Sequence, residues 1–235
     1  MLTSDGAVVA SGLDAVALKP AECELSRATD LPFDRLVIDW EGLDHWPDAE
    51  TLSALAETAR VRVTTPVRAD GFDPLGDEER ARAVAPRLGA AAETAPDAWI
   101  GSEGIERVAL ATGNAQFDLL SPSTDRDLRG LRAAGFGGDL AVYAPTVVSD
   151  DEGALLDALG EYVARRGPVS RALPDGAATD AAASGRAREV LLAAIDDYAL
   201  VGTPADVRRR AEELKEAGAD HAVGYPARGI EAFTS

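Results

Sequence analysis

The sequence has a single cysteine and only two lysines, and each shortage limits what the protein can be. Cys23 has no second cysteine to pair with, which excludes an internal disulfide and a metal knuckle built from cysteines. Lys19 and Lys215 stand beside 21 arginines, because lysine and arginine together number 23. Acidic residues number 41, and the formal net charge is -18. We therefore expect no affinity for nucleic acid or for an anionic membrane surface.

Long hydrophobic runs are also missing. No stretch of about 18 apolar residues occurs, and the first twenty residues lack a basic segment followed by a long apolar one. With the scarcity of cysteine, this predicts a cytoplasmic protein that does not enter a membrane. The balance of few lysines, many acids and many alanines is similar to that of proteins from salt-loving archaea. We interpret the charge as solvation of the fold in high salt, where screening acts over a few ångström.

What the sequence does contain is a regular alternation of short apolar runs with helical patterns, typical of a parallel α/β fold. Eight strands are expected, at 15–20, 35–40, 61–66, 97–101, 117–122, 139–145, 198–202 and 221–226. Helices are expected at 20–28, 50–59, 77–92, 103–112, 125–134, 150–165, 185–195 and 204–217. The pattern predicts one minimal (β/α)8 barrel of the TIM type over residues 1–235. An open doubly wound sheet is the main alternative, although no strand is followed by a glycine-rich dinucleotide fingerprint.

One stretch departs from this alternation. Residues 165–185, "RRGPVSRALPDGAATDAAASG", are rich in alanine, glycine, proline and serine. This composition predicts an extended, flexible connection between the sixth and seventh units.

Active sites of such barrels form where strands end and the following loops begin. Lys19 ends the first strand, where its amine could form a Schiff base, although a surface lysine at a corner is the simpler alternative. Asp39 and His45 lie in the loop after the second strand; the spacing of Asp39, Glu41 and His45 is not diagnostic of a metal site, and we expect none. We assign Lys19, Asp39 and His45 to substrate binding. Motifs of hydrolases and NTPases are absent.

Two segments resemble a known family. The stretch "YALVGTPADVRRRAEELKEAGADHAVGYP", 198–226, reads as a strand, a Gly-Thr-Pro turn, an amphipathic helix ending at Gly218, and a final strand. The stretch "VRVTTPVRADG", 61–71, carries a Thr-x-Pro-x-Arg pattern at Thr64, Pro66 and Arg68. Both are similar to segments of the bacterial-luciferase-like superfamily, which includes the F420-dependent methylenetetrahydromethanopterin reductases of archaea. The cap alone has a simpler reading, since Gly-Thr-Pro starts helices in many folds.

The resemblance implies an oxidoreductase that holds the deazaflavin F420 or FMN at the barrel mouth and uses it for hydride transfer. Polar side chains at the strand ends are assigned to this cofactor: Thr65, Arg68, Ser121, Tyr143 and Arg228. The phosphate-binding glycines expected after the fifth strand are replaced by "SPSTDRD", where Asp125 and Asp127 would repel a phosphate.

Two other functions remain open: a non-catalytic barrel that has lost its cofactor site and acts in binding or assembly, and a lyase that depends on Lys19. The expected partner is a small-molecule substrate, and a homo-oligomer is compatible with the sequence.

Overall fold

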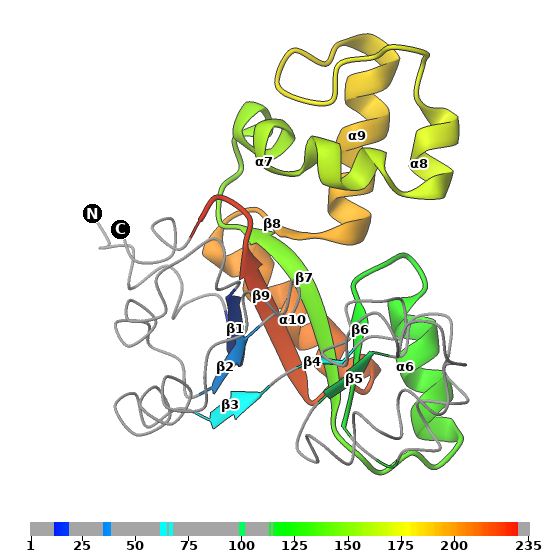
Figure 1. Ribbon diagram of the computed structural model, residues 1–235, viewed down its shortest axis with the longest axis vertical. Coiled ribbons are helices and arrows are strands. Elements are labelled where there is room, and N and C mark those ends of the chain that lie inside the picture. Colours follow the sequence, from blue (N-terminus) through cyan, green and yellow to red (C-terminus); the bar gives the residue numbers. More distant parts are fainter. Residues whose placement is uncertain are drawn as a thin grey trace, which may run out of the picture.

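The computed structural model describes residues 12–18, 35–38, 62–64, 66–67, 99–101, 113 and 115–229. Within them the protein has an α/β fold with a parallel sheet (Figure 1). The strands are β1 Ala15–Leu18, β2 Arg35–Ile38, β3 Arg62–Thr64, β4 Pro66–Val67, β5 Trp99–Gly101, β6 Gln116–Leu119, β7 Leu140–Val147, β8 Leu200–Val201 and β9 His221–Pro226. Each of the eight expected strands is found, the third as the two pieces β3 and β4. In the described part of the chain no helix is long and apolar enough to cross a bilayer.

The strands follow the order β3-β2-β1-β9-β7-β6-β5-β4. β3 and β4 stand at opposite ends of this order, yet only residue 65 separates them along the chain. In a doubly wound sheet the chain starts in the middle and moves outward in both halves. Here it moves outward from β1 to β3, but then continues at the opposite end with β4 and moves inward to β9. The parallel sheet is thus confirmed, and closure into a barrel stays a prediction.

β8 occupies an unexpected place. With β3 and β4 counted as one strand, β7, β8 and β9 are the sixth, seventh and eighth strands of the expected barrel. In such a barrel β8 would lie between β7 and β9. Here β7 pairs directly with β9 over Ala141 to Thr146. Thr146 pairs with Pro226 of β9 and also with Leu200 of β8, so β8 and β9 flank the end of β7 on opposite sides. β8 therefore lies on the β6 side of β7, beyond the point where β6 ends at the pair Leu119–Tyr143.

Both faces of β7 are covered, and all eight of its residues are buried. On one face the core consists of apolar and aromatic side chains, among them Trp99, Phe117 and Tyr143. On the other face Leu120, Val142 and further aliphatic side chains pack beneath α6 (Thr124–Ala133) and α10 (Pro204–Ala217). A strand that is buried on both faces needs apolar residues at nearly every position, which accounts for the continuous apolar run at 139–145.

α10 forms as expected from its sequence. Thr203 and Asp206 make a reciprocal capping box, and Gly218 ends the helix at φ 123. The predicted apolar face is buried, with Val207 and Leu214 completely enclosed. The helices expected at 20–28, 50–59, 77–92 and 103–112 lie outside the described residues.

Three helices form a separate layer beyond the carboxyl ends of β7, β8 and β9 (Figure 1). We call α7 (Glu152–Ala164), α8 (Gly167–Ala172) and α9 (Gly185–Tyr198) the three-helix unit. Its core includes Leu156, Leu159, Leu191 and Ile195 and extends to Val147 at the end of β7, with Val201 of β8 and Ala227 after β9 packed against it.

The stretch 165–185, expected to be extended and flexible, contains α8. Its later part lies against α7: the N–H of Ala181 donates to Asp157 Oδ1 at 2.8 Å. A Cβ at Gly160 would lie 1.9 Å from the carbonyl oxygen of Thr179, so α7 and this segment approach closely. The flexibility itself stays a prediction.

Candidate active site at the carboxyl edge of the sheet

The carboxyl ends of parallel strands meet at one edge of the sheet, which is where α/β proteins place their ligands. Ser121 follows β6 and Arg228 follows β9, and these two strands are the neighbours of β7 on either side. The three-helix unit borders the same edge through Val147 and Ala227. This edge is the candidate site.

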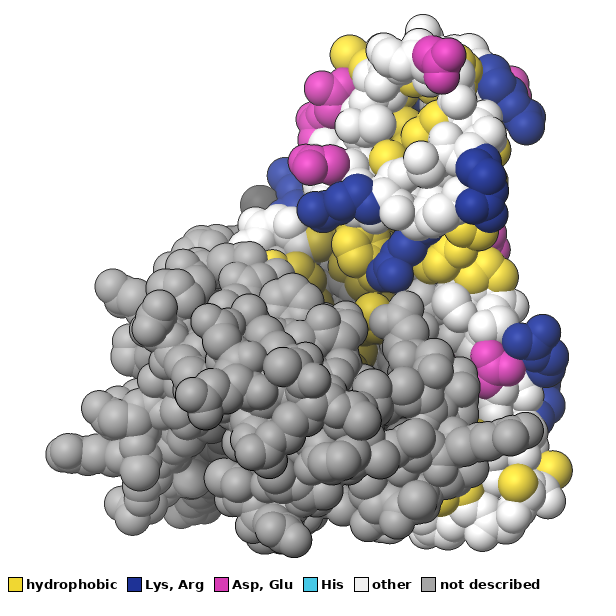
Figure 2. All heavy atoms as spheres, turned by 45° about the vertical axis from the view of Figure 1, so that its right-hand side comes forward, with side chains coloured by type: hydrophobic (Ala, Val, Ile, Leu, Met, Phe, Trp, Pro, Cys, Tyr) yellow, Lys and Arg dark blue, Asp and Glu magenta, His cyan; other side chains and the backbone are white. Residues whose placement is uncertain are grey.

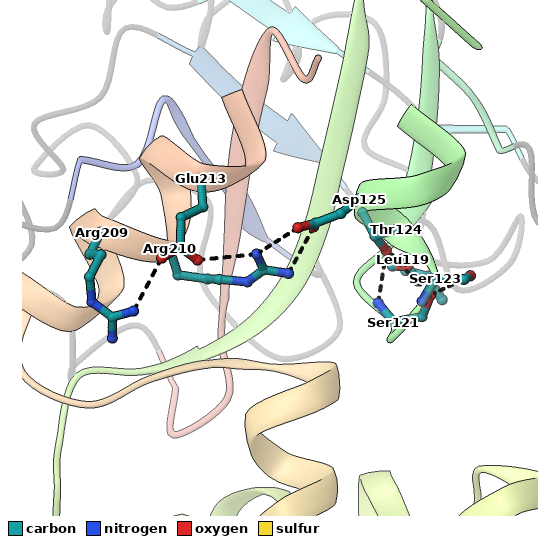
Figure 3. A network of polar contacts seen from close by, with 8 residues as sticks. All are labelled: Leu119, Ser121, Ser123, Thr124, Asp125, Arg209, Arg210 and Glu213. Carbon is teal, nitrogen blue, oxygen red and sulfur yellow. Dashed lines mark hydrogen bonds and ion pairs between the residues drawn. The ribbon is translucent and has the colours of Figure 1, made fainter. Parts of the chain in front are cut away.

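Hydroxyl groups gather after β6, at the start of α6 (Figure 3). Thr124, only 1% exposed, accepts a hydrogen bond from the N–H of Ser121 at 2.9 Å and donates to the carbonyl oxygen of Leu119 at 3.4 Å. The Ser121 hydroxyl lies 3.2 Å from that of Ser123 and 3.3 Å from that of Thr124. The loop is thus held by its own side chains and presents partly exposed hydroxyls.

Asp125 and Asp127, in the first turn of α6, are both paired with arginines. Asp125 lies opposite Arg210 of α10, with oxygen–nitrogen distances of 3.0 and 3.4 Å, and Arg210 also contacts Glu213 at 3.3 Å. Figure 3 shows the Asp125 carboxylate turned toward α10, away from the serine hydroxyls. Asp127 pairs with Arg126 at 3.0 Å. The repulsion of an anion expected from Asp125 is therefore weakened by the opposite charge beside it.

Aromatic rings line the face of the sheet that bears Tyr143. Tyr143 is 5% exposed, stacks on Tyr225 with 6.3 Å between ring centroids, and meets Phe117 at 6.5 Å. Tyr225 lies nearer the carboxyl edge, because it pairs with Pro145 in the register of β7 and β9. Tyr143 thus belongs to the packed interior, and Tyr225 is the ring closer to the candidate site.

At the opposite edge His221 begins β9. Its ring stacks on Trp99 with 5.5 Å between centroids, and its Nε2 lies 3.4 Å from Asp139 Oδ2.

Arg228 lies in the exposed turn after β9. The backbone positions this turn: the N–H of Ala227 donates to the carbonyl oxygen of Thr146 at 3.2 Å, and the N–H of Gly229 to that of Pro226 at 3.0 Å. With the residues that the structure describes, Arg228 makes no ion pair. A cation of this kind can attract an anionic group of a ligand.

Thr203, at the end of β8, is fully used by the helix cap. Its hydroxyl donates to Asp206 Oδ2 at 2.6 Å and accepts from the Asp206 N–H at 3.3 Å. These hydrogen bonds to Thr203, with a smaller contribution from Arg209, lower the pKa of Asp206. The Gly-Thr-Pro turn therefore caps α10, in agreement with the simpler interpretation that such a turn only starts a helix.

Ser121, Tyr143 and Arg228 lie on, or directly after, three neighbouring strands. Five other predicted site residues lie outside the described residues: Lys19, Asp39, His45, Thr65 and Arg68. Sequence reasoning missed Thr124, although a serine-rich turn before a helix is a signal for such hydroxyl bonding.

The chain matches a known protein family. The family model described as "Family of unknown function (DUF7388)" matches residues 8–81 and 75–233. The chain belongs to this family. No curated protein sequence matches this DUF7388 member.

Two solved structures are similar to the DUF7388 chain. One is an F420-dependent secondary alcohol dehydrogenase in complex with an F420-acetone adduct, with a TM-score of 0.50, 13% identity, and coverage of 94% of this chain and 98% of that one. The other is the monooxygenase RslO1 from Streptomyces bottropensis, with a TM-score of 0.46, 15% identity, and coverage of 99% and 91%. At 13% identity the likeness to the dehydrogenase concerns the fold alone.

Proposed function

We propose that this DUF7388 protein is a luciferase-like oxidoreductase that binds F420 or FMN at the carboxyl edge of the sheet. Bound there, the cofactor supplies hydride transfer. The chain's own contribution is to bind the cofactor's anionic tail and to orient its planar ring.

The strand order supports a closed barrel as the scaffold. β3 pairs with β2 and β4 pairs with β5, and one residue joins β3 to β4 along the chain. A sheet whose two ends belong to one short segment closes on itself. We infer that β3 and β4 are one barrel strand whose two halves complete the ring.

The donor set at the carboxyl edge fits a flavin-type cofactor. The single observation that carries the proposal is that the Ser121 hydroxyl and the Arg228 guanidinium follow the two strands that flank β7. Hydroxyls and a guanidinium suit phosphate oxygens, and the guanidinium offers two parallel donors. The ring of Tyr225, stacked on that of Tyr143, lies near that edge. In the proposed site Thr65 and Arg68 add further contacts to the tail, and Lys19, Asp39 and His45 bind substrate.

The experiment that tests the proposal is titration of F420 and of FMN into the protein in molar KCl. Binding of either, weakened several-fold by Arg228→Ala, supports it. Arg129→Ala is the matched control, because Arg129 is another exposed arginine without an ion pair to a described residue, on α6. If neither cofactor binds at about 1 mM, corresponding to about -4 kcal/mol, the proposal is wrong.

A second candidate is a non-catalytic barrel of the same fold. Two observations favour it: the direct pairing of β7 with β9, which leaves one strand fewer between them, and the packing of Tyr143 among aromatic rings. This candidate predicts a folded protein that binds neither F420 nor FMN, so the same titration distinguishes the two.

A further inference from the structure

We draw no further inference here: the strongest candidate, the hydrophobic surface at the base of the three-helix unit (Figure 2), is an apolar face for which nothing in the described residues shows what covers it.

Discussion

Arg132 ties three elements together at the amino edge of the sheet, and its replacement by methionine is the most informative test of the fold. Its Nε donates to the carbonyl oxygen of Gly218 at 2.9 Å, and its Nη1 to those of Phe136 and Gly138 at 2.9 and 2.8 Å. Its Nη2 contacts Asp220, whose Oδ2 also accepts from the N–H of Leu140 at 2.7 Å. One side chain thus joins α6, the end of α10 and the start of β7.

The cost of losing these bonds can be estimated from their number and exposure. Hydrogen bonds that involve a charged group contribute about 1.5–3 kcal/mol each when they are buried. The Arg132 side chain is 28% exposed and that of Asp220 is 42% exposed, so water replaces part of what is lost, and the ion pair itself adds little. We expect Arg132→Met to lower the free energy of unfolding by about 3 kcal/mol, or Tm by about 6–12 °C for a chain of this size.

The assay is thermal unfolding followed by circular dichroism at constant KCl. Arg126→Met is the control, because Arg126 is 79% exposed and contacts only the adjacent Asp127 among the described residues. This control is expected to change Tm by no more than about 2 °C. Equal Tm values for the two variants would refute the reasoning, since they would mean that the three carbonyl contacts contribute nothing.

Three further predictions concern other parts of the molecule. In urea titrations Gly160→Ala should destabilise the protein by about 3 kcal/mol, because the new Cβ meets the Thr179 carbonyl. Gly130→Ala should stabilise α6 slightly in the same assay, because no atom lies within 4 Å of its Cβ. Thr203→Ala should lower Tm by about 2–4 °C. The same variant should raise the pKa of Asp206, measured by NMR. Because that pKa is lowered in the folded protein, the stability that the Thr203 hydrogen bonds contribute is present above the pKa of the unfolded chain. It is lost as pH falls through the pKa of the folded protein. Raising KCl from about 0.1 M to 1 M should raise Tm, since the Debye length falls from about 10 Å to about 3 Å around a chain of charge -18, and an unchanged Tm would contradict this.

The elements with strong local signals could be predicted from the sequence. α10 carries its own start in the Gly-Thr-Pro turn and its own stop in Gly218, and both act as expected. β7 is long and buried on both faces, so its apolar run was unambiguous. In these cases the information lies within a few residues of the element itself.

Features that depend on distant partners could not be predicted. The position of β8 is decided by its pairing with Thr146 and Val147, and the two residues of this strand carry no signal for a partner. The pairing of Asp125 with Arg210 joins residues 85 apart in the chain, so the acids after β6 were read as repelling an anion.

α8 was missed for a local reason. Its Gly167-Pro168 start is typical of a loop, yet proline also fits the first turn of a helix, as it does here.

The central claim is that a flavin-type cofactor binds at the carboxyl edge of the sheet, and a crystal structure of the protein with F420 tests it most directly. The account predicts density for the cofactor at that edge, between the loop after β6 and the turn after β9, with its anionic tail in contact with Arg228. Density for F420 at the amino edge, beside His221 and Asp139, or its absence from crystals grown at millimolar F420, would contradict the claim.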